Sequence, residues 1–221
     1  MVNEQLKEIK TQLRLAMNGS ASASMREKGL VYKLNFGVEL PRIKQIASQF
    51  EPNHDLAQAL WKENIRECKI LAGLLQTVDS FYPEIMDIWI EDMPTLEIAE
   101  LTCMNLFQNL PYAPAKSLQL IADEREYPQV CGFLTIARLL ARKGDMPERV
   151  ENEFLDQALV SFLMGNYSVR KAVMTALKKY MAGNETHAFR LCRMVEPLKD
   201  GESEQGRLLW QWVTQEVELN F

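Results

Sequence analysis

The chain has few of the residues that build metal centres and nucleophilic sites. It has two histidines, His54 and His187, and four cysteines, none of which belongs to a Cys-x-x-Cys pair. A zinc site needs clustered thiolates or imidazoles, so we expect no metal site and no cofactor. The cysteines lie far apart inside apolar segments, which predicts buried free thiols in a reducing cytoplasm. They are Cys68, Cys103, Cys131 and Cys192.

The sequence also lacks the short motifs of several common enzyme classes. It has no Walker-type phosphate loop, no Gly-x-Ser-x-Gly elbow, no His-Glu-x-x-His helix and no Gly-x-Gly-x-x-Gly turn. Phosphate-loop ATPases, α/β-hydrolases, zinc peptidases and Rossmann enzymes are therefore poorly supported. No apolar run approaches the roughly 18 residues of a membrane span. The first residues form an amphipathic pattern and not a secretory signal, so we expect a cytoplasmic protein with no membrane partner.

Strand signals are nearly absent, whereas helical periodicity runs through the whole chain. Apolar residues three or four apart predict a first helix over 2–16, and the small polar residues of 17–24 predict a flexible loop. Two helices are predicted within 55–76, the second with a capping box from Asn64 to Glu67. A helix also restarts at Pro41. Further helices are predicted at 83–91, 94–110, 114–122, 127–143, 147–164, 168–182, 185–195 and 203–219.

The spacing of the helix breaks predicts an architecture of stacked helix pairs. The major breaks fall near residues 52, 80, 112, 145 and 183, roughly 30–40 residues apart, which is the length of one helical-pair repeat. We therefore predict an all-α, HEAT-like solenoid of antiparallel helix pairs. The whole chain, 1–221, is expected to form one domain, with an N-terminal helix and flexible loop over 1–24 and helical repeats over 25–221. An irregular helical bundle is the alternative.

Charge is distributed unevenly along the chain. The net charge is −5, which argues against tight non-specific binding of DNA. Residues 138–193, however, hold ten basic and six acidic side chains, and the segments on either side are acidic. Basic residues on successive helix pairs can line one wall of a solenoid and follow a phosphate backbone, or can form a solubilising outer face. The candidate DNA contacts are Lys33, Arg42, Lys44, Arg66, Arg138, Arg142, Lys143, Arg170 and Lys171.

Two blocks resemble a known family. The first is Phe36-Gly37-Val38-Glu39-Leu40-Pro41-Arg42, and the second runs from Leu60-Trp61 to Arg66-Glu67. In order and spacing they are similar to the AlkD-like DNA alkylation repair family, a group of HEAT-like repeat DNA glycosylases. The first block is offset by one residue before its glycine. The resemblance implies a HEAT-like fold, DNA as the partner and excision of alkylated bases as the family activity.

The excision site implied by the resemblance does not carry over intact. The family's Trp-Asp-x-Val-Asp element falls on Leu96–Glu100, so leucine replaces the aromatic residue and Glu100 stands at the essential carboxylate. A further family arginine falls on Val130. An aromatic face and a carboxylate stabilise the cationic transition state of base release, and an arginine anchors the phosphate. Glu100 is therefore the one candidate catalytic residue, or an ordinary surface glutamate.

Three functions follow from this comparison. The first is a member of the family that has weak or no catalysis and binds DNA of unusual structure, such as damaged or branched DNA. The second is an active glycosylase of N-alkylated bases with a rearranged site at Glu100. The third is a protein-interaction scaffold that does not bind DNA. Whether the chain is an enzyme stays open at this stage.

Overall fold

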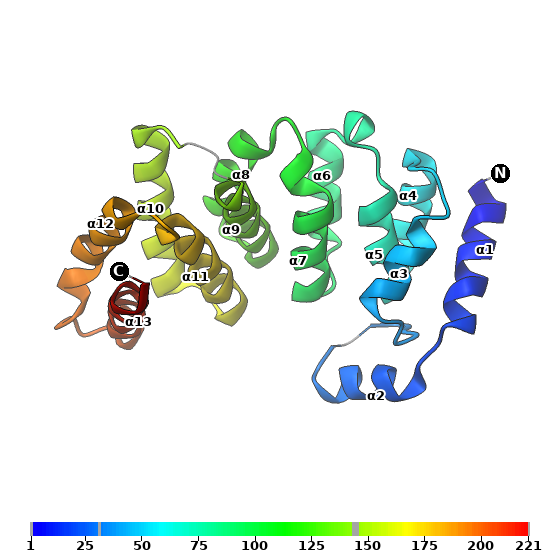
Figure 1. Ribbon diagram of the computed structural model, residues 1–221, viewed down its shortest axis with the longest axis horizontal. Coiled ribbons are helices and arrows are strands. Elements are labelled where there is room, and N and C mark those ends of the chain that lie inside the picture. Colours follow the sequence, from blue (N-terminus) through cyan, green and yellow to red (C-terminus); the bar gives the residue numbers. More distant parts are fainter. Residues whose placement is uncertain (1, 31, 143–145, 221) are drawn as a thin grey trace. The chain divides into compact units, whose positions relative to one another are not determined.

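In the computed structural model, the structure describes residues 2–30, 32–142 and 146–220. Within these residues the regular structure consists of thirteen α-helices and three short 3-10 helices (Figure 1). The one pairing of β type there is an isolated bridge between Leu34 and Ile65. This confirms the prediction of an all-α fold. No described helix is long and apolar enough to cross a membrane.

The chain forms two compact units, Met1–Pro111 and Tyr112–Phe221. The first, unit 1, holds seven α-helices. They are α1 (Val2–Leu15), α2 (Gly19–Glu27), α3 (Leu40–Ala47), α4 (His54–Lys62), α5 (Arg66–Leu75), α6 (Pro83–Glu91) and α7 (Leu96–Asn105), with 3-10 helices at Val78–Ser80 and Phe107–Asn109. The prediction that 1–221 act as one domain stays a prediction.

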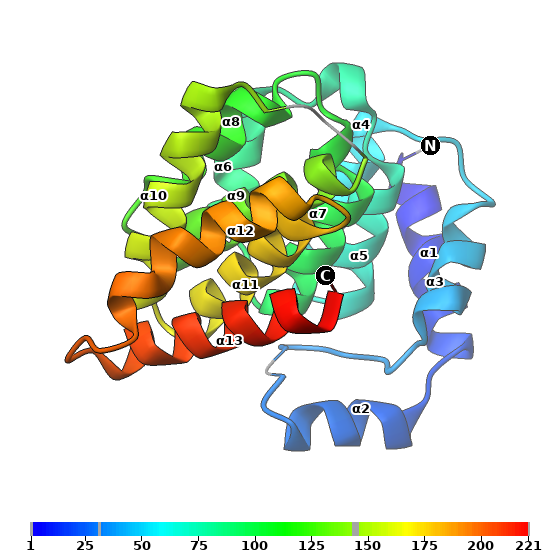
Figure 2. The same ribbon diagram turned by 60° about the vertical axis from the view of Figure 1, so that its left-hand side comes forward.

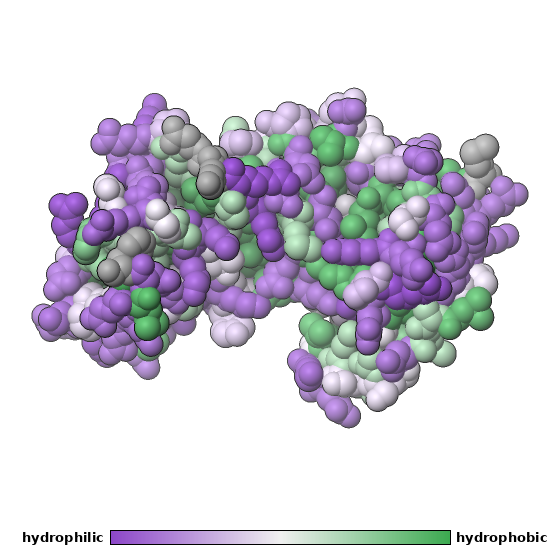
Figure 3. All heavy atoms as spheres, in the orientation of Figure 1, coloured by the Kyte–Doolittle hydropathy of each residue, from purple (hydrophilic) through white to green (hydrophobic). Residues whose placement is uncertain are grey.

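The second, unit 2, holds six α-helices. They are α8 (Ala113–Ile121), α9 (Glu126–Ala141), α10 (Glu148–Met164), α11 (Tyr167–Met181), α12 (Glu185–Val195) and α13 (Glu204–Asn220), with a 3-10 helix at Glu196–Leu198. Helix α9 packs against α8 and α11, and α12 packs against α13 (Figure 2). Over these last helices, α10 to α13, the face drawn in Figure 3 is mostly hydrophilic, with scattered apolar side chains.

Aromatic packing fills the core of unit 1. The rings of Trp61 and Trp89 are stacked with centroids 4.0 Å apart, and Phe81 meets Trp89 edge-on at 4.9 Å. All three side chains are buried. Rings of this size bury large apolar areas and gain further from their mutual geometry. Trp61, one of the residues that carries the family resemblance, is therefore a core residue.

Close packing of α8 on α9 depends on a glycine in the middle of a helix. A Cβ on Gly132 would lie 2.7 Å from the Ile121 side chain and 2.9 Å from the Ser117 carbonyl oxygen. Glycine weakens a helix interior relative to alanine, so its presence here is explained by the close approach of the two helices. The approach brings Phe133 and its neighbours into the core of unit 2.

Two local predictions are corrected by the structure. Residues 17–24 were expected to be a flexible loop, but Gly19–Glu27 form α2, capped by the Asn18 side chain, which accepts a hydrogen bond from Ala21 N at 3.0 Å. Helix α5 was expected to begin with Asn64 as its cap, but the N-cap is Ile65, which has no side-chain cap bond. The carboxylate of Glu67 binds distant backbone groups instead.

Candidate nucleic-acid interface

The side chains of Arg66 and Glu67, which carry part of the family resemblance, bind the backbone of the connection between α2 and α3. Arg66 is 4% exposed, and its Nε and Nη2 donate to the two carboxylate oxygens of Glu97 at 2.9 and 2.6 Å. Its Nη1 donates to the Val38 carbonyl at 3.0 Å. The two parallel bonds to Glu97 form the bidentate geometry that suits a guanidinium. Arg66 was predicted to contact DNA, but its guanidinium lies in the interior, so we leave it out of the proposed interface.

Glu67 belongs to the same network, because its carboxylate also accepts a hydrogen bond from Arg66. Its carboxylate accepts hydrogen bonds from the backbone N–H groups of Phe36 at 3.2 Å and of Val38 at 3.1 Å. The side chain is wholly buried, and a buried charge is tolerated only when it is paired and hydrogen-bonded. The first block of the resemblance is thus held in place by the second.

The same network shifts the pKa values of its members. Burial would raise the pKa of Glu97, but hydrogen bonds from Arg66 and Tyr32 and the charge of Arg66 lower it below the usual range. Burial would lower the pKa of Arg66, yet Glu97 and Glu67 raise it. The pKa of Tyr32 is raised, first by burial and then by Glu97, although its bond to Thr95 opposes the shift. These groups are locked in one charge state at neutral pH.

The expected excision site falls on α7 and on α9. Leu96 and Glu100 stand four residues apart on α7, and both are half-buried. Helix α7 begins after Thr95, whose hydroxyl accepts a hydrogen bond from Ile98 N at 3.4 Å. Val130 is 0% exposed in the core of unit 2. At these positions the chain offers a carboxylate, but neither an aromatic face nor a cation.

The three remaining candidates of unit 1 are exposed. Lys33 lies in the connection between α2 and α3, and Arg42 and Lys44 lie on α3. The Nη1 of Arg42 donates to Gln45 Oε1 at 2.6 Å. Residues two apart on a helix point in different directions, so Arg42 and Lys44 do not form one cluster.

The predicted DNA contacts of unit 2 form two sets, which lie at opposite ends of two parallel helices. Residues near the starts of α9 and α11, including Gln129 and Val169, line one hollow, so these packed helices run in the same direction. Arg138 and Arg142 lie at the end of α9, whereas Arg170 and Lys171 lie in the first turns of α11. With a rise of about 1.5 Å per residue, the two sets are separated by roughly 10 Å or more along the helix axes. Lys143 lies outside the described residues.

One of these sets contributes to a groove formed by α10, α11 and α13. The groove has a volume of about 480 Å³ and combines cations with aromatic and apolar side chains. Its residues include Tyr167, Arg170, Lys171, Met174, Lys178, Trp212 and Glu216. Such a mixture of positive charge and accessible aromatic faces is typical of surfaces that bind nucleic-acid strands.

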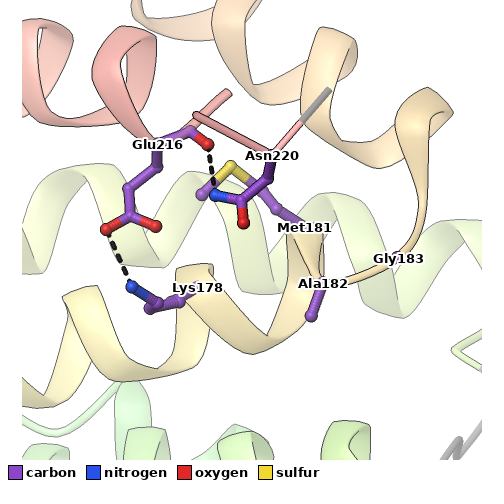
Figure 4. Close-up of a pocket in the computed structure, with 6 residues that line it drawn as sticks. All are labelled: Lys178, Met181, Ala182, Gly183, Glu216 and Asn220. Carbon is purple, nitrogen blue, oxygen red and sulfur yellow. Dashed lines mark hydrogen bonds and ion pairs between the residues drawn. The ribbon is translucent and has the colours of Figure 1, made fainter. Parts of the chain in front are cut away.

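A surface ion pair forms one end of this groove. Lys178 Nζ lies 2.8 Å from Glu216 Oε1, and both residues also line a second hollow of about 200 Å³, with Met181 and Asn220 (Figure 4). The pair therefore stands between the two hollows. The carboxylate of Glu216 neutralises Lys178, and Arg170 and Lys171 are two further cations in the lining of the groove.

Sequence reasoning identified Arg170 and Lys171 but missed their aromatic neighbours. The predicted helix at 168–182 leaves Tyr167 just outside it, and nothing in the local sequence connects Tyr167 with Trp212 in the predicted helix at 203–219. One signal was available: Lys171 and Lys178 are seven residues apart and therefore share a helix face. No group of three or more His, Cys, Asp or Glu side chains in the described parts of the chain has the geometry of a metal site.

The fold and the groove define a HEAT-like helical-repeat protein with a cationic, aromatic surface. The model of the DNA alkylation repair enzyme family matches residues 9–189, so the chain belongs to that family. No curated protein matches the chain in sequence.

A solved structure has the same fold. It superposes with a TM-score of 0.80 at 14% identity, covering 97% of this chain and 94% of the other. That protein is described as belonging to a new family related to the HEAT-like repeat DNA glycosylases, with affinity for branched DNA structures. At this identity the likeness establishes the HEAT-like fold predicted from the sequence.

Proposed function

We propose that this protein binds DNA, with a preference for branched forms, and excises alkylated bases weakly or not at all. The observation that carries the proposal is the groove of unit 2, where Arg170 and Lys171 stand beside Tyr167 and Trp212. Family membership supports DNA as the ligand, and the structural relative's affinity for branched DNA supports the preferred form. Six of the predicted cations are exposed and enter the proposal as phosphate contacts: Lys33, Arg42, Lys44, Arg138, Arg142 and Lys171. The half-buried Arg170 is the seventh.

Weak or absent catalysis is proposed from three positions. Leu96 has no π face to stabilise a cationic base, and Val130 is a core residue that cannot bind phosphate. Glu100 alone would have to stabilise the charge that develops as the glycosidic bond breaks. A single carboxylate supplies only part of such stabilisation.

Fluorescence anisotropy tests the proposal. Labelled duplex, four-way-junction and abasic-site DNA would be titrated with the protein at two salt concentrations. Binding should weaken with salt, because each neutralised phosphate releases counterions. Reversing the charge of Arg138, Arg142, Arg170 and Lys171 together should reduce the slope of log K against log salt by about three to four. Reversal of Glu153 and Asp156, which are exposed acids on α10, serves as a control that should not weaken binding.

The two alternatives predict different results. An active glycosylase would release alkylated bases from DNA, and Glu100→Gln would abolish the release. An interaction scaffold would bind none of the DNA probes at low salt. The scaffold is favoured by the net charge of −5 and by an apolar hollow of about 360 Å³ between α8, α9 and α10, whose lining includes Leu118, Leu139 and Val150.

A cytoplasmic location and a single functional domain belong to the same proposal. The four cysteines are free thiols in the structure, which suits a reducing compartment. Cell fractionation checks the location. Limited proteolysis near Pro111, with and without DNA, checks whether the two units act as one domain.

A further inference from the structure

The groove of unit 2 combines cations with aromatic and apolar side chains, although the net charge of the protein is −5. Tyr167, which lines the groove, is 77% exposed, whereas Met164, which is 84% exposed, lines the neighbouring hollow. Single exposed apolar residues are common, but Tyr167 adjoins Arg170 and Lys171 at the start of α11. Exposed apolar side chains that gather beside polar ones mark a binding surface.

Local structure fixes the backbone that carries these groups. The Asn166 side chain caps α11 by accepting a hydrogen bond from Val169 N at 3.1 Å, so Tyr167 is the first residue of a capped helix. Arg170 Nε donates to the Phe162 carbonyl at 3.0 Å, which orients the guanidinium beside the groove. The backbone that carries Tyr167 and the guanidinium of Arg170 are thus set before any ligand arrives, which lowers the entropic cost of binding.

The arrangement suits one form of DNA better than another. A duplex hides the faces of its bases and presents phosphates, so it gains nothing from an exposed aromatic ring. A single strand offers both unstacked bases and phosphates, which aromatic and cationic side chains bind together. The volume of about 480 Å³ is in the range of small-molecule sites and can hold individual nucleotides.

We propose that this groove binds a single-stranded DNA segment. Phosphates contact Arg170 and Lys171, and bases stack on Tyr167 and Trp212. The inference rests on the proposed DNA binding and names the form of DNA that this site takes. Single-stranded tails, gaps and the openings of branched molecules all present such segments.

The test compares three labelled probes: a blunt hairpin duplex, the same hairpin with a tail of about ten thymidines, and free oligothymidine. The tail should strengthen binding of the unaltered protein by about five- to tenfold, since stacking of even one base contributes this much. Tyr167→Ala should remove most of that gain, and it should weaken binding of the blunt hairpin by less than about twofold. Tyr167→Phe, which keeps the ring, should retain the gain.

Two further variants make the result specific. Tyr82→Ala removes a tyrosine of unit 1 that is 60% exposed, and it should leave all three affinities unchanged. Oligothymidine should quench tryptophan fluorescence, and Trp212→Phe should remove most of that quenching. Circular dichroism verifies that each variant folds.

The outcomes separate this inference from the proposed function. A tail-specific loss in Tyr167→Ala that Tyr167→Phe restores supports the groove as a single-strand site. Binding of the blunt and tailed hairpins with equal affinity, or with no effect of Tyr167→Ala, overturns this inference and leaves DNA binding standing. Absence of binding to every probe at low salt overturns both.

Discussion

Each unit contains an ion pair between helices, and the two pairs differ in their surroundings. In unit 1, Arg66 and Glu97 are 4% and 25% exposed, with N and O atoms 2.6 Å apart. In unit 2, Lys178 and Glu216 are 61% and 17% exposed, at 2.8 Å. The distances are similar and both carboxylates are partly covered, so the pairs differ in the cation, which is buried in unit 1 and exposed in unit 2. The pair with the buried cation is part of the architecture, whereas the pair with the exposed cation borders a surface that a ligand can reach.

In this chain the residues of the shared motif do not form the candidate binding site. Arg66 belongs to a block that resembles a DNA repair family, and it is a basic residue. Its donors nevertheless serve Glu97, Glu67 and the Val38 carbonyl. The basic residues near the groove belong to no recognised motif. The motif residue Arg66 stabilises the fold, whereas the candidate interface is formed by residues outside the motif that a ligand can reach.

Breaking the buried pair should have the largest effect. Arg66→Ala leaves two carboxylates, Glu67 and Glu97, without their cation in a poorly solvated place. Loss of one partner of a buried pair costs about 3–5 kcal/mol. Urea denaturation would measure the free energy of unfolding. Arg42→Ala, at an exposed arginine, should change it by less than about 0.5 kcal/mol. A loss below about 1 kcal/mol for Arg66→Ala would show that the network is dispensable.

A second comparison uses glycines with the same backbone conformation. Gly37 has φ +70°, and a Cβ there would overlap the Asn18 carbonyl oxygen and lie 2.7 Å from Ser22 N. Gly183 has φ +68°, with no atom within 4 Å of the added Cβ. Gly37→Ala should therefore cost about 2–4 kcal/mol, from strain and backbone overlap together, and Gly183→Ala about 1–2 kcal/mol. Equal losses in urea denaturation would contradict the close packing of α2 on this turn.

The buried network should also make stability depend on pH. The pKa of Glu97 is lower in the folded protein than its ordinary value of 4.5. A carboxyl of this kind contributes stability above its unfolded pKa, and that stability is lost as the pH falls through the folded pKa. Glu97→Gln should thus be less stable than the unaltered protein at pH 7, and the difference should shrink below pH 4.5. A difference that stays constant from pH 7 to pH 3 would contradict the assignment.

Helix periodicity and breaks were sufficient to predict most of the fold. The patterns at 127–143, 168–182 and 203–219 correspond to α9, α11 and α13 within two residues. The prediction was wrong for α2, where a Gly-Ser-Ala stretch resembles a loop. Tertiary bonds stabilise that helix, because Asn18 N donates to the Phe36 carbonyl at 2.9 Å and the Ser22 hydroxyl donates to the Asn35 carbonyl at 2.8 Å. Such partners are distant in sequence and leave no local signal.

The candidate site was less accessible to sequence reasoning. Charge alone could not separate Arg66, which is buried, from Lys171, which is exposed. Nor could it show that Arg138 and Arg170 lie at opposite ends of parallel helices. The groove depends on α11 packing close to α13, and its two aromatic residues, Tyr167 and Trp212, are 45 positions apart. Only the packed structure brings them together.

Breaking the exposed pair should have the smallest effect on stability and a measurable one on binding. Glu216→Gln removes the carboxylate that neutralises Lys178 at the end of the groove. Because exposed pairs contribute little, the free energy of unfolding should change by less than about 1 kcal/mol. The groove gains one positive charge, so binding to the tailed hairpin at low salt should tighten by about two- to threefold, and high salt should remove the gain. Glu204→Gln, at an exposed glutamate in the first turn of α13, is the matched control and should leave binding unchanged. Weaker binding in Glu216→Gln would mean that the carboxylate supports the groove, and the distinction between a structural pair in unit 1 and a dispensable one in unit 2 would then fail.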